Sequence, residues 1–357
     1  MANVPSLKIH PEAIFAILAA ILFGLATPVA KLLIGDVSPQ MLAGLLYSGS
    51  GIGLLLLYAL IRLFKQNNSE HLSIQASDLS WLSGGILFGG VLAPLLLMQG
   101  LRATPASMAS LLLNLESVFT ALMAWLIFKE HFDRRILIGM TCILVGSLLL
   151  SWPKQLSSAF PFDTLAIVGA CACWAIDNNL TRKIAANDAL LIACIKGLVA
   201  GLINLGIALS LGNALPVFTV GMSAAAIGFL SYGVSLVLFV MSLRLIGTAR
   251  TGAYFSVAPF VGVACSFLLL HEQPDTLFWL ATCLMLIGVW LHLTEHHAHL
   301  HHHEELLHQH SHFHDEHHHH THEFDWDGGE PHVHPHEHKN LSHSHPHFPD
   351  MHHQHKH

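Results

Sequence analysis

The chain contains one long stretch of sequence twice. Residues 101–130, LRATPASMASLLLNLESVFTALMAWLIFKE, return without a gap as residues 243–272, LRLIGTARTGAYFSVAPFVGVACSFLLLHE, so the spacing is 142 residues. At this spacing Glu130 aligns with Glu272, and nearly all residues between the charged ends are apolar. Because a repeated sequence is expected to repeat its fold, the chain is predicted to consist of two similar halves.

Ten long apolar stretches make up most of the first 294 residues. Each stretch is continuous rather than alternating, which favours helices over the strands of a barrel. Their lengths of about 18 to 25 residues match the thickness of a bilayer. The sequence therefore predicts an all-α integral membrane protein with ten transmembrane helices, at residues 12–34, 41–63, 81–101, 105–128, 135–152, 163–181, 189–211, 219–243, 249–270 and 276–294.

The basic residues of the short loops predict the orientation in the membrane. If the N-terminus is cytoplasmic, the loops on that side hold ten Lys and Arg, whereas the opposite loops hold only Arg102 and Lys154. Such an excess marks the cytoplasmic side. Five helices per half is an odd number, so the halves are predicted to be inverted repeats, as in many transporters. The predicted repeats are residues 12–152 and 163–294, with residues 1–11 as a cytoplasmic N-terminus and both termini cytoplasmic.

The C-terminal end has a different composition. Of the 31 histidines, 26 lie from His296 onward, and residues 295–357 are low in large apolar side chains, so we predict a disordered, cytoplasmic, low-complexity tail. Imidazole favours zinc, nickel, cobalt and copper, so the tail is predicted to bind such metals weakly and collectively. A brush whose charge depends on pH is the alternative. The best-spaced histidines, on one helical face or on one side of an extended chain, are His296, His299, His303, His332, His334, His336 and His338.

Few ionisable residues lie inside the apolar stretches. A charge at the centre of a membrane helix costs about 2.5 to 3.5 kcal/mol, so it normally faces protein or a wet cavity. Glu116 lies halfway along the fourth stretch, and Asn114 lies two positions before it on a different side of the predicted helix. We predict that at least one of these two lines a transport pathway. The alternative is that Glu116 is protonated or hydrogen-bonded and only holds the helices together.

Asp177 and Lys196 form a second candidate group. Both lie on the order of 10 Å from the cytoplasmic ends of their predicted helices, and opposite charges at the same depth predict an ion pair. A structural role is one interpretation, and contact of Lys196 with an anionic substrate is the other. Asn178, Trp174 and Tyr254 are further candidates for the pathway, although ordinary packing between helices explains them equally well.

Three stretches carry a resemblance to a known family: the doubled stretch, CWAIDNNLTRKI from Cys173 and IACIKGLVAGLINL from Ile192. Over about residues 11–293 the chain resembles the EamA-type transporters of the drug/metabolite transporter superfamily. The resemblance implies a secondary carrier in the bacterial inner membrane that exports a small organic metabolite by alternating access. The family often has proline where this chain has Ser117, while Pro259 stands at the equivalent place in the second half. We therefore expect a helix break at Pro259 and none at Ser117.

Other classes of protein fit the sequence less well. A transporter of zinc, nickel or cobalt ions, whose tail collects or senses the ion, is the main alternative. No nucleophile with a nearby base suggests an enzyme, no basic stripe with aromatic residues suggests nucleic-acid binding, and no cofactor is required. The expected partners are the lipid bilayer, a small-molecule solute and divalent transition metals at the tail, and a homodimer is compatible with the sequence. All six cysteines lie in apolar stretches, so disulfides are not expected.

Overall fold

The computed structural model describes residues 13–64, 76–128, 134–151, 162–184, 187–293, 298–303, 306–312, 332–338 and 341–346. It divides into two units, of which one contains residues 1–295 and 349–357 and the other contains residues 296–348. The predicted N-terminal segment, residues 1–11, lies outside the described residues.

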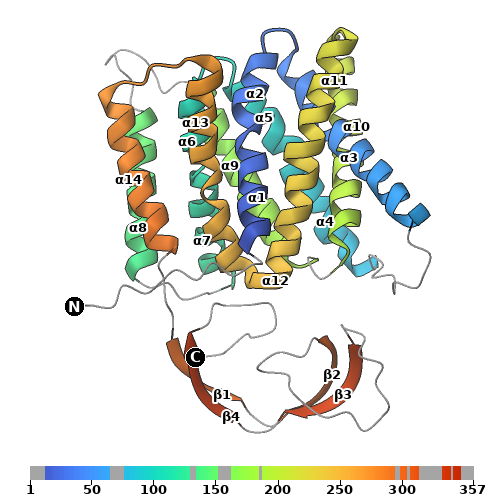
Figure 1. The fold of residues 1–357 in the computed structure, drawn as a ribbon, viewed down its shortest axis with the longest axis vertical. Coiled ribbons are helices and arrows are strands. Elements are labelled where there is room, and N and C mark those ends of the chain that lie inside the picture. The colour runs from blue at the N-terminus through green and yellow to red at the C-terminus, as the bar shows by residue number, and fades with distance from the viewer. Residues whose placement is uncertain are drawn as a thin grey trace. The chain divides into compact units, whose positions relative to one another are not determined.

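The first unit is a bundle of helices lying side by side (Figure 1). Two π-helical segments, η2 and η3, interrupt it. In chain order its elements are α1 (Ala13–Gly24), α2 (Ala26–Leu33), α3 (Pro39–Phe64), η1 (Ala76–Asp78), α4 (Leu79–Gly85), η2 (Ile86–Leu92), α5 (Ala93–Gly100), α6 (Ala106–Leu112), α7 (Leu115–Phe128), α8 (Arg134–Ser151), α9 (Phe162–Arg182), α10 (Ala189–Ser210), α11 (Phe218–Ile227), η3 (Gly228–Val234), α12 (Ser235–Phe255), α13 (Ala258–Leu270) and α14 (Thr276–Leu293).

Seven helices in the described part of the chain are long and apolar enough to cross a membrane. They are Ala13–Leu33, Pro39–Ile61, Ala76–Gly100, Ala106–Met123, Arg134–Ser151, Ala189–Ser210 and Phe218–Leu243. Ala258–Leu270 and Thr276–Leu291 are shorter apolar helices. Helix α9 is not among the seven, and it carries two aspartates, two asparagines and an arginine. The bundle is all-α, as predicted, and its outward-facing apolar side chains suit a lipid environment.

The packing of the bundle repeats between the two halves. Helix α3 packs along α10 and α8 along α14, and each of these pairs joins equivalent helices of the two halves. Helix α6 packs against α13, which is the counterpart of α7. Helix α1 packs on α12, while α9, the counterpart of α1, packs on α5. The π-helical segments η2 and η3 begin at Ile86 and Gly228, which are separated by the same 142 residues as the doubled sequence. The sequence repeat is therefore also a repeat of local backbone geometry.

The fourth apolar stretch is broken between α6 and α7, contrary to the expectation from Ser117. Helix α6 ends at Leu112 and α7 begins at Leu115. Polar side chains, rather than a proline, accompany this break. Asn114 Nδ2 donates to Leu111 O at 3.0 Å, and Ser117 Oγ donates to Asn114 O at 2.8 Å. They satisfy carbonyl groups near the break, as tertiary polar contacts commonly do in membrane helices. The expected break near Pro259 is confirmed, since α12 ends at Phe255 and α13 begins at Ala258.

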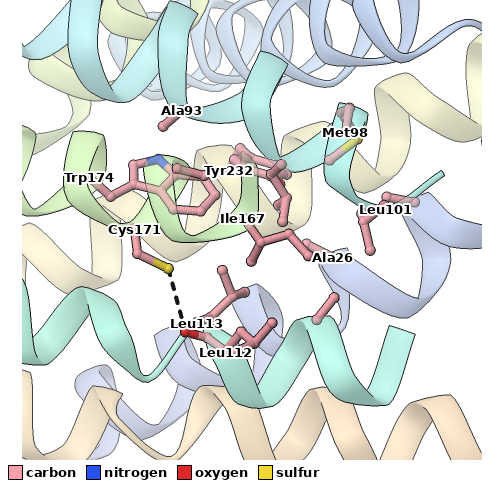
Figure 2. Close-up of a cluster of buried hydrophobic side chains, with 14 of the residues drawn as sticks. Ala26, Ala93, Met98, Leu101, Leu112, Leu113, Ile167, Cys171, Trp174 and Tyr232 are labelled. Atoms are coloured by element: carbon pink, nitrogen blue, oxygen red, sulfur yellow. Dashed lines mark hydrogen bonds between the residues drawn. The ribbon is translucent and has the colours of Figure 1, made fainter. Parts of the chain in front are cut away.

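A buried apolar core surrounds this break (Figure 2). Ile167 and Cys171 of α9 lie against Leu112 and Leu113, and the Cys171 thiol donates to the Leu112 carbonyl at 3.5 Å. Figure 2 also labels Trp174 and Tyr232, which belong to the same core. All six cysteines are free thiols. The core thus holds the broken helix against α9, which carries three of the seven predicted pathway residues.

The second unit contains four strands: β1 (Ala298–His303), β2 (Leu306–His312), β3 (His332–His338) and β4 (Leu341–Pro346). Strand β1 pairs antiparallel with β4 and β2 pairs antiparallel with β3. These four segments are extended and paired in the structure, whereas the disorder of the tail in isolation stays a prediction, because an isolated two-stranded pair is only marginally stable in water.

The histidines of the second unit follow the strand pattern rather than a continued helix. Helix α14 ends at Leu293 and Ala298–His303 is extended, so His299 and His303 do not lie on one face of a continued helix. Strand β3 is extended from His332 to His338, which agrees with the extended conformation predicted for these histidines. His296 and the side chains of the other tail histidines lie outside the described part of the structure, so metal binding stays a prediction.

Candidate functional site

A cavity with about 560 Å³ of open space lies within the helical bundle and is lined by both halves of the chain. It brings together five of the seven predicted pathway residues, namely Glu116, Trp174, Asp177, Asn178 and Lys196. The remaining lining residues are mostly aromatic or carry hydroxyl groups: Phe23, Tyr47, Ser231, Tyr232, Ser235, Leu236, Phe239 and Phe255. The lining therefore combines charged, polar and aromatic side chains from both halves.

Asp177 and Lys196 form the predicted ion pair. Lys196 Nζ lies 2.6 Å from Asp177 Oδ1 and 2.8 Å from Oδ2, and it also donates to Thr181 Oγ1 at 3.1 Å. The Thr181 hydroxyl in turn donates to Asp177 Oδ1 at 2.8 Å. Lys196 is 3% exposed and Asp177 is 7% exposed, so the pair is largely removed from solvent. Three contacts use the donor capacity of the ammonium group, and the pair contributes no net charge to the cavity.

Two glycines of the third apolar stretch make room for this pair. A Cβ atom on Gly89 would lie 1.9 Å from Asp177 Oδ2, and one on Gly85 would lie 2.8 Å from Asp177 Oδ1. Gly89 lies in the π-helical segment η2, a geometry that often occurs at functional sites. Its carbonyl oxygen accepts hydrogen bonds from Tyr47 Oη at 2.7 Å and from Trp174 Nε1 at 3.1 Å. One residue without a side chain therefore positions three side chains of the cavity.

Glu116 stands in the first turn of α7, directly after the helix break. Asn178 Nδ2 donates to Glu116 Oε1 at 2.7 Å. In the described part of the chain no basic side chain pairs with this carboxylate, and Oε2 has no hydrogen-bond partner. The position at a helix N-terminus favours a negative group there. Glu116 is therefore the one acidic side chain of the cavity whose charge no neighbouring lysine or arginine balances among the described residues.

Six aromatic rings form a continuous cluster along the cavity. The Phe23 ring lies 5.8 Å from Trp174, 5.9 Å from Tyr232 and 5.3 Å from Phe255, measured between ring centroids. Tyr47 contacts Tyr232 at 5.2 Å, and Phe239 extends the cluster from Phe255 at 4.8 Å. Of these rings only Trp174 is among the residues that the sequence singles out for the pathway. Phe23 could have been found from the repeat, because FGLATPVAK from Phe23 aligns with WAIDNNLTR from Trp174.

The other two predicted pathway residues lie elsewhere. Asn114 is 1% exposed at the α6–α7 break, where its amide faces the Leu111 carbonyl and lies 3.9 Å from Met285 Sδ. Tyr254 precedes the cavity residue Phe255 and is not one of the lining residues. The sequence could not separate these positions, because adjacent residues of a helix point about 100° apart and only the packing decides which of them meets the cavity.

Comparison with known proteins places the chain among membrane transporters. A model of the EamA-like transporter family matches residues 10–152 and again residues 163–294. The chain belongs to the EamA-like transporter family. It is 27% identical over 289 residues to an uncharacterized transporter of Methanothermobacter thermautotrophicus, a match that covers 77% of this chain and 84% of the relative. The resemblance seen in the sequence is therefore confirmed, and the protein is a multi-pass membrane protein of a transporter family.

Two further similarities agree with this assignment. The uncharacterized transporter YyaM of Bacillus subtilis is 24% identical over 185 residues, which cover 48% of this chain and 59% of YyaM. A protein of known crystal structure is also similar: the match covers 79% of this chain and 98% of that protein's chain, with a TM-score of 0.60 and 16% sequence identity. At this identity the crystal structure supports the fold of the EamA-like transporter and nothing more specific.

A second polar arrangement holds the turn between α5 and α6 in this EamA-like transporter. Lys31 Nζ donates to the carbonyl oxygens of Leu101, Arg102 and Thr104, at 3.2 Å and 3.0 Å for the last two. Glu272 accepts from Ala106 N at 2.7 Å and from the backbone and hydroxyl groups of Ser107. A cation thus stabilises the C-terminus of one helix and an anion the N-terminus of the next.

These contacts lie beyond one end of the cavity. Phe23 lines the cavity, and Lys31 lies eight residues further along the same stretch, a distance of about 12 Å at the rise of a helix. The residues of α12 that line the cavity are Ser235, Leu236, Phe239 and Phe255. In the described part of the chain no group of three or more His, Cys, Asp or Glu side chains is arranged to hold a metal ion.

Proposed function

We propose that this protein is a secondary transporter that exports a small organic solute across the bacterial inner membrane by alternating access. The observation that carries the proposal is the cavity, which is lined by residues of both halves, among them Glu116 and a cluster of aromatic rings. A cavity at the interface of two repeats is the usual place for the substrate in transporters built this way.

The proposed topology has ten membrane helices in two inverted repeats, with both termini in the cytoplasm. The charges of the loops support the orientation. The pairing of α3 with α10 and of α8 with α14 supports two equivalent halves, as does the recurrence of the π-helical segment at the repeat spacing. Two of the ten proposed helices, residues 219–243 and 249–270, share the continuous helix α12 near their junction.

Alternating access is supported by a difference between two equivalent segments. Residues 101–105 form a turn that Lys31 and Glu272 hold in place, whereas the equivalent residues 243–247 are helical within α12. In the repeat Glu130 aligns with Glu272, and Glu130 lies outside the described residues. We infer that the two segments exchange conformations when the cavity changes the side to which it opens, since inverted repeats can adopt each other's conformation.

The tail is proposed to bind divalent transition metals on the cytoplasmic side, with 26 histidines from His296 onward as the supporting observation. The alternative proposal, a metal-ion transporter, gives the tail the same metal-binding role, but in it the helical bundle transports a metal ion instead of an organic solute. Removing the tail after Leu293 separates the two proposals, because only a metal transporter that collects ions through the tail loses its flux.

The experiment that tests the proposed function is a flux screen in sealed vesicles that contain the full chain. Amines, amino acids, sugars, organic acids and zinc, nickel and cobalt ions are the test solutes, and Glu116→Gln and Asp36→Asn are compared with the wild type. Asp36 is exposed and lies outside the cavity, so its variant controls for the loss of one negative charge. Transport of an organic solute that Glu116→Gln reduces and Asp36→Asn preserves supports the proposal. The absence of flux for every solute refutes it.

A further inference from the structure

We propose that the cavity binds a protonated amine with an apolar body. The inference rests on the proposed function and adds the class of substrate. Three features of the cavity point to this class: the balance of its charges, the arrangement of its aromatic rings and one tyrosine hydroxyl group that has no hydrogen-bond partner among the described residues.

The charges of the cavity favour a cation. Its lining contains one basic side chain, Lys196, and two carboxyl side chains, Glu116 and Asp177. Asp177 and Lys196 are the pair described above, and they neutralise each other at 2.6 Å. Glu116 receives a single hydrogen bond from the neutral amide of Asn178. When Glu116 is ionised, the cavity therefore carries a net negative charge, and a bound cation restores neutrality at a site where an uncompensated charge is expensive.

The same contacts argue against an anionic substrate at Lys196. Its ammonium group already donates to both oxygens of Asp177 and to Thr181 Oγ1, and the side chain is almost fully buried. An anion would have to break this pair and leave a buried carboxylate without its partner. The free carboxylate oxygen of Glu116 needs no such rearrangement, because it accepts a hydrogen bond from an ammonium group directly.

The aromatic cluster provides the second feature. Phe23 contacts Trp174, Tyr232 and Phe255 at centroid distances between 5.3 and 5.9 Å, and all four rings line the cavity. The faces of aromatic rings attract a cation, and their carbon atoms also pack against apolar groups. A ligand with a charged nitrogen and an apolar body matches both properties of this wall.

The hydroxyl group of Tyr232 is the third feature. Tyr232 is 6% exposed and lines the cavity, and its hydroxyl oxygen has no hydrogen-bond partner in the described part of the structure. A buried polar group without a partner is uncommon in folded proteins. An ammonium group with N–H donors can donate a hydrogen bond to this oxygen, which a quaternary ammonium ion cannot do.

The test measures binding to the purified full-length protein in lipid nanodiscs by isothermal titration calorimetry. The probes are phenethylammonium, its neutral counterpart phenethyl alcohol and the anion phenylacetate, at a pH where carboxylates are ionised. We expect phenethylammonium to bind at least about tenfold more tightly than the other two. Glu116→Gln is expected to weaken its binding by about tenfold or more, while Asp36→Asn leaves it unchanged.

Tyr232→Phe provides a second variant that keeps the ring, so it tests the site even if Glu116→Gln does not fold. It is expected to weaken binding of phenethylammonium by several-fold and to leave phenethyl alcohol unaffected. The proposal is overturned if phenylacetate or phenethyl alcohol binds as tightly as the ammonium ion. It is also overturned if folded Glu116→Gln and Tyr232→Phe both keep wild-type affinity.

The flux screen separates this proposal from the proposed function. If vesicles transport another class of solute and the protein does not bind phenethylammonium, the substrate class is wrong and the transporter function stands. If the protein binds phenethylammonium with the expected dependence on Glu116 and no solute crosses the membrane, the cation site stands and the transporter function is wrong.

Discussion

The buried pair of Asp177 and Lys196 allows a quantitative prediction. Lys196→Met removes the ammonium group that contacts Asp177 at 2.6 and 2.8 Å and leaves that carboxylate buried with Thr181 as its remaining donor. Removal of one partner of a buried pair costs about 3 to 5 kcal/mol of unfolding free energy. Methionine has a similar length and adds no cavity, so we attribute the expected loss to the uncompensated charge.

The double variant Asp177→Asn with Lys196→Met removes both charges and keeps the shape of the site. Asparagine fits the space that Gly85 and Gly89 leave for Asp177, whereas a charge reversal would place the longer lysine against these glycines. We expect the double variant to be within about 1 to 2 kcal/mol of the wild type, because a neutral pair has no desolvation penalty of this size. The coupling free energy between the two substitutions is then about 2 kcal/mol or more.

The assay is reversible unfolding of the purified protein in mixed micelles, followed by circular dichroism, with Asp36→Asn as the control for net charge. Transport is measured on the same variants, because a pair with a purely structural role allows the stable double variant to transport. If Lys196→Met is as stable as the wild type, or if the double variant is as unstable as the single one, our explanation of the pair is wrong.

Three further predictions concern other parts of the structure. Gly89→Ala places a Cβ atom 1.9 Å from Asp177 Oδ2, so it should lower the melting temperature and the flux, at a cost in stability of about 1 to 3 kcal/mol. In the control variant Gly206→Ala the new Cβ atom meets no atom within 4 Å, so this variant should be as stable as the wild type or slightly more stable. Equal melting temperatures of the two variants would contradict this prediction. Glu272→Ala removes the cap of α6 and should cost about 1 to 2 kcal/mol in the same unfolding assay, and unchanged stability would show that the cap does not hold this turn. Truncation after Leu293 should leave the flux of the organic solute unchanged and lower the zinc retained after dialysis, and a loss of organic flux would show that the tail takes part in transport.

Much of the fold could be predicted because hydropathy and the repeat are properties of the sequence itself. Long apolar stretches predict membrane helices wherever they occur, and the doubled sequence indicates two equivalent halves. Glu116, Asp177 and Lys196 could be selected for the same reason, since an ionisable residue within an apolar stretch is costly and stands out. The equal depths of Asp177 and Lys196 were sufficient to predict their ion pair, which the structure contains.

The helix break and the tail show where local patterns were insufficient. The absence of proline at Ser117 suggested a continuous helix, but Asn114 and Ser117 provide the hydrogen bonds that a break requires. In the tail, strand pairing joins segments that are far apart in the sequence, such as β1 and β4. In both cases the deciding contacts are made by groups whose pairing the composition does not reveal.

The sequence by itself determined the membrane-helical fold, the repeat, the family and the charged residues of the candidate site. Only the tertiary structure decided that Glu116 lines the same cavity as a cluster of aromatic rings, that Gly89 makes room for Asp177, and that Asn114 and Tyr254 lie outside the cavity. The physical reason is that the energetic cost of a charge in a membrane depends on the residue alone, whereas a cavity depends on which helices become neighbours. Phenylalanine and tyrosine are common in membrane helices, so their role at this site became visible only when the packing of α1, α9 and α12 brought their rings together.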